Sequence, residues 1–223
     1  MVSAGVRPED LDRIASALPA DRLDEAIGWL DKALDARELT GTIVRSSRAL
    51  SELVDAVKAY SHMDRAPVEY VDIHEGIEDT LRIIGHKLKD IEVVRQYDRA
   101  LPRVQTGGSD LNRIWTNLID NAIAAVNERG TITVATFRDG DHVRVEIIDD
   151  GPGIPPDIQR RIFEPFFTTK EVGQGTGLGL DIVRRIVTGR CGGEIEFRSR
   201  PGETVFQVGL LAERAAQGEQ PTE

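Results

Sequence analysis

Residues 173–187, GQGTGLGLDIVRRIV, constrain the fold of this chain most strongly, because four alternate glycines stand ahead of an amphipathic helix. Glycine has no Cβ atom, so the backbone N–H groups of such a run can approach an anion closely. A helix that begins near Leu178 would add the positive end of its dipole. The segment predicts contact with phosphate groups, although a glycine-rich loop taken alone is often only a flexible connection.

A second glycine-containing segment, DDGPGIP at residues 149–155, follows a predicted strand. Asp149 would leave the strand as a fixed hydrogen-bond acceptor, and Gly151 and Gly153 would allow a flat ring to approach the backbone. A carboxylate is a suitable partner for the exocyclic amine of adenine. An ordinary Asp-Gly-Pro turn explains this segment equally well when it is taken alone.

Two asparagines lie in the sequence NLIDNA, on a long predicted amphipathic helix. Asn117 and Asn121 are four residues apart, so both side chains lie on one helix face. Asparagine is a poor helix former, which indicates a role other than helix stability. Amide oxygens can bind Mg²⁺, whose other ligands are usually waters and phosphate oxygens. The pair therefore indicates a place where this metal ion could be held.

A fourth segment, IFEPFFTTK at residues 162–170, carries three phenylalanines around a proline within an otherwise polar region. This composition suggests a hinged lid that is anchored by apolar side chains. Lys170, at the end of the segment, is placed to reach a phosphate.

Residues 1–66 read as helical throughout. After a break at Pro19, a heptad-like series with alternating steps of three and four, the spacing of a coiled-coil seam, is formed by Ala36, Leu39, Ile43, Ser46, Leu50, Leu53, Val57 and Tyr60. A seam this long favours a dimer formed through a helical hairpin or bundle of residues 20–64. The alternative is a helix that folds back onto its own domain.

Residues 67–212 predict a separate α+β domain, in which one mixed sheet carries helices on one face. Asp72 and Glu75 form a capping-box-like start to a helix that would run to about Lys89. Strands are expected over 91–98, 103–105, 131–137, 142–149, 193–199 and 204–211, with a turn at 139–140. The polar residues 213–223 are expected to be a disordered tail.

The composition excludes several functions. A net charge of −10 argues against a nucleic-acid binder. A single cysteine and four scattered histidines make a zinc site improbable. No apolar run approaches the length of a membrane span, and the N-terminus lacks a signal-peptide pattern, so a cytoplasmic protein is expected.

In order and spacing, the four segments resemble the N box, first glycine box, F box and second glycine box of the histidine-kinase ATP-binding domain. That domain belongs to the Bergerat-fold ATPases, together with DNA gyrase, the Hsp90 chaperones and MutL. The sequence PGETVFQVGL resembles the closing Gly-x-Thr element of the same domain. The resemblance covers about residues 68–212 and implies an α/β sandwich, while the preceding helices resemble the second half of a dimerisation domain.

The resemblance implies a role for each matching residue. Asp149 would bind the adenine amine between Gly151 and Gly153, while Asn121 would bind Mg²⁺ with Asn117 beside it. Asn117, Asn121 and Lys170 would be the catalytic residues, and residues 151–176 would form the lid. The other ATP-binding positions that it implies are Ile154, Phe166, Phe167, Thr168, Lys170, Gly173, Gly175, Thr176, Gly177, Leu178, Gly179 and Thr204.

One position bears on the reaction that the resemblance implies. Hydrolysing relatives carry a glutamate one turn before the metal-binding asparagine, where this chain has Asn117, which cannot accept a proton from water. This position favours phosphoryl transfer over hydrolysis, and the resemblance implies ATP-dependent phosphorylation of a histidine, for relay to the receiver domain of a response regulator. Ala124 and Ala125 stand where many family members carry a phosphate-contacting basic residue, a task that Lys170 would take over.

The sequence contains no acceptor-histidine box. His74, in HEGIED, has the right first pair of residues, but it follows the heptad segment and Glu75 already has a capping role. The acceptor is therefore expected upstream of Met1 or on a partner protein. Two alternatives remain: a Bergerat-fold serine kinase of the anti-sigma type, and a non-catalytic ATP-sensing dimer.

Overall fold

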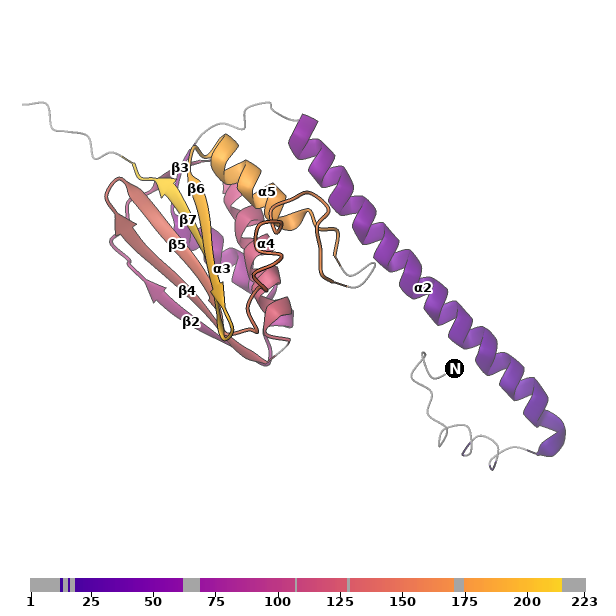
Figure 1. Ribbon diagram of the computed structural model, residues 1–223. Helices are drawn as coiled ribbons and strands as arrows, with labels where there is room; N and C mark the ends of the chain where they lie inside the picture. The colour runs from indigo at the N-terminus through magenta and orange to yellow at the C-terminus, as the bar shows by residue number, and fades with distance from the viewer. Residues whose placement is uncertain are drawn as a thin grey trace, which may run out of the picture. The chain divides into compact units, whose positions relative to one another are not determined.

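The computed structural model of the chain describes residues 13, 16, 19–61, 69–106, 108–127, 129–170 and 175–213. The chain divides into two compact units, one dominated by a long helix and one that contains the sheets (Figure 1). No described helix is both long and apolar enough to span a membrane.

The first unit is built on helix α2, which runs without interruption over Ala20–Ser61. No proline lies within this range, and so the backbone has no strong reason to turn. A hairpin turn is therefore excluded inside 20–61. Leu39, Ile43 and Leu50 of the predicted seam are more than 60% exposed on this helix.

The second unit begins with strand β1, Glu69–Val71, and helix α3, Ile73–Ile83. The carboxylate of Asp72 accepts a hydrogen bond from the backbone N–H of His74 at 2.8 Å, as the predicted helix cap requires. The helix ends well before the predicted Lys89, because Ile84 leaves the helical conformation and a short 3₁₀ turn, η2 (Gly85–Lys87), follows.

The main sheet has five strands in the order β2-β4-β5-β7-β6. β2 pairs parallel to β4, and the other pairs are antiparallel, so the sheet is mixed as predicted. The strand bounds are Ile91–Tyr97 for β2, Gly130–Asp139 for β4, His142–Asp149 for β5, Glu194–Arg200 for β6 and Glu203–Leu211 for β7. The predicted turn between β4 and β5 contains Gly140 at φ +60°.

Helices cover one face of this sheet, which confirms the predicted α+β class (Figure 1). They are α3, α4 (Gly108–Ala125) and α5 (Gly179–Arg185), and α5 continues into the π-helical turn η3 (Ile186–Arg190). Alternate residues of β5 point toward the helices, and Val143, Val145 and Ile147 are buried there with Trp115. The apolar core thus lies between the sheet and α4.

A smaller sheet joins the two ends of the second unit. β1 pairs antiparallel with β3 (Val104–Thr106), and Val104 also forms a bridge with Ala212. The backbone N–H of Glu213 donates to the carbonyl of Arg103 at 2.8 Å. The rest of the predicted disordered tail, 214–223, lies outside the described residues.

Candidate functional site

The helix with the two asparagines lies directly against the end of the glycine-rich run. Asn117 donates its amide N–H to the carbonyl of Arg113 at 2.8 Å, which leaves its Oδ1 facing Gly179. A Cβ atom on Gly179 would lie 2.7 Å from that oxygen, so any other residue here would displace the Asn117 amide. Two segments that are 62 positions apart in the sequence therefore meet here, and a glycine at position 179 leaves the Asn117 amide in place.

Asn121 lies one turn further along the same face of α4, and its side chain is half-buried. Its amide has no hydrogen-bond partner within the described part of the chain, so both of its polar atoms are available to a ligand. No cluster of three His, Cys, Asp or Glu side chains able to hold a metal is present among the described residues. Mg²⁺ fits an amide oxygen supplemented by phosphate and water oxygens, and therefore needs no such cluster.

Asp149 is the last residue of β5 and is 3% exposed. Its Oδ1 accepts a hydrogen bond from the backbone N–H of Gly151 at 3.1 Å. Burial raises the pKa of this carboxyl to about 6, against the smaller opposing effect of the Gly151 hydrogen bond. A Cβ on Gly151 would lie 2.7 Å from that oxygen and 3.0 Å from the Ala125 Cβ, which explains the glycine.

The first glycine box is fixed to the turn between β6 and β7. Gly153 has φ +82°, and a Cβ there would lie 2.6 Å from the carbonyl oxygen of Arg200. The backbone N–H of Gly202 donates to the carbonyl of Gly151 at 2.9 Å. The predicted glycines thus allow two loops to pack backbone against backbone.

Ser199 is a site residue that the sequence prediction missed. Its hydroxyl accepts a hydrogen bond from the backbone N–H of Ile154 at 2.8 Å and lies 2.9 Å from the hydroxyl of Thr204. Thr204 is 3% exposed and lies opposite Asp149 in the β5–β7 register. A sequence signal was present, because Ser199 is polar where the strand alternation of Ile195 and Phe197 calls for an apolar residue.

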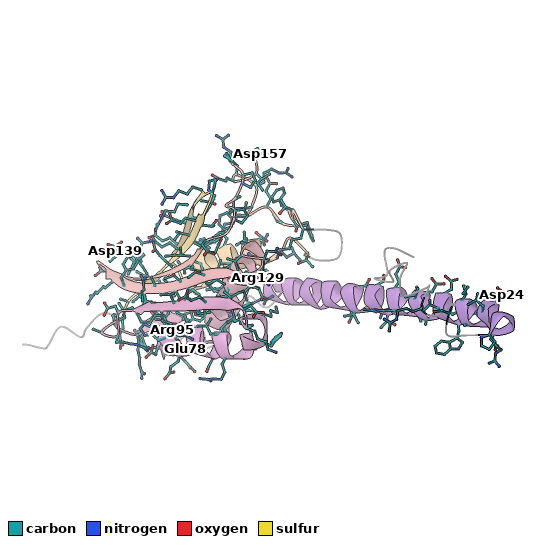
Figure 2. The ribbon with its side chains drawn as sticks, turned by 90° about the horizontal axis from the view of Figure 1, so that it is seen from below. Asp24, Glu78, Arg95, Arg129, Asp139 and Asp157 are labelled. Atoms are coloured by element: carbon teal, nitrogen blue, oxygen red, sulfur yellow. The ribbon has the colours of Figure 1, made fainter. Side chains whose placement is uncertain are left out.

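Residues 151–170 of the predicted lid contain turns but no regular helix or strand. Figure 2 shows Asp157 at the outer edge of this segment. Phe163 anchors the segment to the sheet by an edge-on contact with Phe197, 5.9 Å between ring centroids. The guanidinium carbon of Arg161 lies over the Phe167 ring, 4.4 Å from the ring centroid. The predicted apolar anchors are therefore Phe163 and Phe167.

Phe166 behaves differently from its two neighbours. It is 65% exposed and has φ +66°, a conformation that costs a residue with a side chain about 1–2 kcal/mol. Gly177, at φ +67°, lies against the same peptide unit, and a Cβ there would be 2.4 Å from the Phe166 carbonyl carbon. The second glycine box is therefore in contact with the F box through their backbones.

Gly177→Ala is expected to weaken ATP binding at least tenfold and to lower the melting temperature, because the new methyl group must displace the Phe166 peptide. Gly192→Ala is the matched control, since Gly192 has φ +61° but open space around its Cβ position. Calorimetric titration and thermal melting measure both effects. Equal ATP affinities in the two variants would show that the contact with the F box has no role in nucleotide binding.

The remaining predicted site residues lie at the end of the lid segment and just before α5. Thr168 and Lys170 are exposed near the end of the described lid segment, whereas Gly175 and Thr176 are half-buried. Leu178 is buried at 4% exposure and immediately precedes α5. Gly173 lies outside the described residues.

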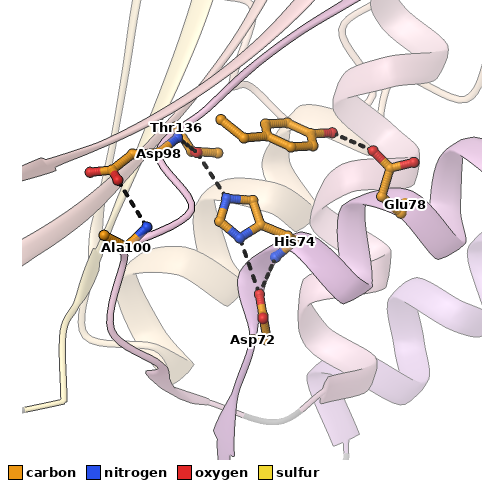
Figure 3. Close-up of polar contacts among 7 residues, drawn as sticks. Asp72, His74, Glu78, Asp98, Ala100 and Thr136 are labelled. Atoms are coloured by element: carbon orange, nitrogen blue, oxygen red, sulfur yellow. Dashed lines mark hydrogen bonds and ion pairs between the residues drawn. The ribbon is translucent and has the colours of Figure 1, made fainter.

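His74, the weak acceptor candidate, is held in a buried network (Figure 3). Its side chain lies 3.2 Å from Asp72 through Nδ1 and 3.0 Å from the Thr136 hydroxyl through Nε2. Asp98 adds a backbone N–H to the same hydroxyl at 3.1 Å. With both ring nitrogens engaged and 7% of the residue exposed, His74 is poorly placed to attack a phosphoryl group.

The same network extends along α3. The Tyr97 ring is tilted by 45° against the His74 ring, with 4.9 Å between the ring centroids, and the Tyr97 hydroxyl donates to Glu78 at 2.8 Å. Glu78 also accepts from Arg95, which lies beside it in Figure 2, and this hydrogen bond lowers the pKa of the Glu78 carboxyl. A groove of about 390 Å³ beside these residues is lined by charged side chains. It lacks the exposed glycine backbone of the glycine boxes, so we assign it no nucleotide.

Comparison with known proteins points to one family. Residues 107–214 match the family model described as histidine kinase-, DNA gyrase B- and HSP90-like ATPase. The chain is 35% identical over 191 residues to the sensory histidine kinase/phosphatase NtrB of Rhodobacter capsulatus, covering 78% of this chain and 52% of that protein. The chain therefore spans about half the length of this curated relative.

Solved structures give the same result. The nucleotide-free catalytic domain of the histidine kinase ThkA is 32% identical with a TM-score of 0.61, covering 66% of this chain and 97% of that one. Full-length ShkA in complex with AMPPNP is 26% identical with a TM-score of 0.67, covering 83% of this chain and 40% of that one.

Proposed function

Because this chain belongs to the family of histidine kinase ATP-binding catalytic domains, we propose that it transfers the γ-phosphoryl group of ATP to a protein histidine. The contact between Asn117 and Gly179 carries the proposal, since it brings the asparagine helix against the glycine-rich run. Asp149 and Thr204 lie opposite each other in adjacent strands of the same domain. These residues supply donors and acceptors suited to adenine, phosphates and a hard cation.

Each group has a separate task in this proposal. Asp149 accepts a hydrogen bond from the adenine amine, and the backbone of residues 175–179 borders the phosphates at the N-terminus of α5. Asn121 would hold Mg²⁺, and the bound ion would neutralise negative charge on the phosphates. Lys170 adds a positive charge near the terminal phosphate. The protein's contribution is positioning, which suits a transfer with little covalent chemistry of its own.

Asn117 favours transfer over hydrolysis. Its amide N–H group is already donated to the Arg113 carbonyl, and an amide oxygen is too weak a base to take a proton from water. Water near the γ-phosphate is therefore not activated by this residue. The phosphoryl group is retained until an acceptor histidine arrives.

The test uses the purified chain with γ-labelled ATP and Mg²⁺, with and without a separate protein that carries a phosphoacceptor histidine. We expect protein-bound label that is labile to acid and stable to base, the signature of phosphohistidine. Acid-stable label would instead indicate a serine kinase. ATP binding with no label on either protein would indicate an ATP-sensing module, and rapid phosphate release without label would indicate a hydrolase.

The acceptor histidine is proposed to be one other than His74. If label appears on the chain alone, His74→Gln should retain it, since both ring nitrogens of His74 are engaged in hydrogen-bonding contacts. Loss of the label in His74→Gln, with ATP affinity unchanged, would assign the acceptor to His74 and contradict this part of the proposal. His62, which lies outside the described residues, would be substituted next. The receiver domain of a response regulator is the proposed final acceptor.

The helix α2 is proposed to form a homodimer through its exposed apolar seam. Ile43→Glu should convert the dimer to a monomer, because it places a charge where Ile43, 68% exposed in a single chain, would be buried between two copies. Arg37→Glu, which changes a polar position outside the seam, is the control and should remain dimeric. Light scattering gives the mass directly, and an unchanged mass for Ile43→Glu would exclude this seam.

A further inference from the structure

Ser199 lies near the end of β6, the edge strand of the main sheet. It pairs directly with Thr204 of β7, and Thr204 pairs with Asp149 of β5. The three polar side chains form one row across the end of the sheet, on the face that is otherwise lined by Phe197, Phe206 and other core residues. Buried polar groups need hydrogen-bond partners: Ser199 and Thr204 contact each other, and backbone N–H groups of Gly151 and Ile154 donate to Asp149 and Ser199.

One hydrogen bond to this row has a fixed direction, and it limits the others. The backbone N–H of Ile154 can only donate, so the oxygen of Ser199 must accept at that 2.8 Å contact. Ser199 can then donate its own proton across the 2.9 Å contact to the hydroxyl of Thr204. A hydroxyl has one proton, so a Thr204 oxygen that accepts from Ser199 retains its own proton for another acceptor.

We propose that Ser199 is a positioning residue for base selection: it orients the Thr204 hydroxyl as a hydrogen-bond donor beside the acceptor carboxylate of Asp149. The inference rests on the proposed function, since it concerns the same nucleotide site. Adenine presents an amine donor next to the N1 acceptor, which matches an Asp149 acceptor beside a Thr204 donor. Guanine presents an oxygen acceptor next to an N1–H donor, which opposes that arrangement.

A purely structural role for Ser199 makes a different prediction. Loss of its hydroxyl would leave the Ile154 N–H without an acceptor and would lower stability. It would, however, affect ATP and GTP binding to the same extent. The ratio of the two affinities therefore separates base selection from stability, because a uniform change in the folded protein cancels in the ratio.

The experiment compares Ser199→Ala and Ser199→Thr in the full chain, with Mg–ATP and Mg–GTP affinities measured by calorimetry and melting temperatures measured in parallel. We expect Ser199→Ala to reduce the preference for ATP over GTP about fivefold or more, the size of one lost buried hydrogen bond. Ser199→Thr retains the hydroxyl and should restore most of the preference. Thr106→Val, which removes a buried hydroxyl bonded to Cys191, should lower only the melting temperature.

Two outcomes would overturn the inference. An unchanged affinity ratio in a less stable Ser199→Ala would reduce Ser199 to a structural residue. If that variant does not fold, Ser199→Cys retains the size with a weak donor, and a wild-type ratio in it would have the same meaning. A wild-type chain that binds neither nucleotide would instead refute the proposed function itself, and with it the inference.

Discussion

Asn121→Ala is expected to lower the affinity of the chain for Mg–ATP roughly 100-fold, through loss of a ligand to the metal ion. The melting temperature should change little, because the Asn121 amide has no partner in the described part of the chain that the substitution would break. The measurement is a calorimetric titration with ATP in Mg²⁺ and in EDTA. Wild type should bind more tightly in Mg²⁺, and the variant should bind equally weakly in both.

Asn112→Ala is the matched control for that prediction. Asn112 is an exposed asparagine on the same helix, nine residues earlier and therefore on the opposite face. Its substitution should leave both affinities at the wild-type level. If Asn121→Ala keeps the Mg²⁺ dependence of the wild type, the metal ion is not bound at this residue.

Asp149→Asn is expected to weaken ATP binding by about 10- to 100-fold, because the charged acceptor for the adenine amine is lost. The wild-type affinity should also fall as the pH drops below about 6, where Asp149 gains a proton. ATP itself titrates near this pH, but it does so equally with both proteins. The pH dependence that wild type shows beyond that of the variant therefore belongs to Asp149.

The same substitution should stabilise the unliganded protein at pH 7.5. The pKa of Asp149 is about 6 in the folded state against an ordinary value of 3.8, so the folded protein binds the proton more tightly than the unfolded chain. The stability that this proton provides is complete below pH 3.8 and is lost as the pH rises through 6. This pKa difference corresponds to about 3 kcal/mol in the free energy of unfolding. The neutral amide of the variant does not lose this stability as the pH rises.

Thermal melting at pH 4 and 7.5 tests this sign directly. The melting temperature of the variant should exceed that of wild type by several degrees at pH 7.5, and the difference should nearly vanish at pH 4. Asp150→Asn serves as the control, since it removes the same charge from an exposed side chain. A wild type that is more stable than Asp149→Asn at pH 7.5 would mean that burial does not raise the pKa of the Asp149 carboxyl.

The glycine positions and regular elements of the candidate site could be predicted from the sequence because each depends on a local rule. Gly151, Gly153 and Gly179 are explained by a close approach of other atoms, and such positions are visible as glycines in the sequence. The mixed sheet and its helices follow from alternation and amphipathic periodicity. Regular secondary structure and closely approached glycines can therefore be predicted from the sequence alone.

Contacts between distant segments could not be read in the same way. The pairing of Ser199 with Ile154, and of Gly177 with Phe166, joins residues whose proximity depends on the whole fold. The end of α3 was also misplaced by several residues, because His86, Lys87 and Lys89 are all compatible with helix. Local propensity does not report where tertiary packing stops a helix.

The small sheet at the border of the second unit has a consequence for how this domain can be joined to others. Val71 and Ala212 both lie against Val104, so the first and last strands of the domain are separated by one intervening strand. Adjacent strands lie about 4.8 Å apart, which places the two ends within about 10 Å of each other. A domain whose ends meet can be inserted into a loop of another protein at little cost in chain entropy. We therefore expect this domain to fold when it is inserted into a loop of another protein.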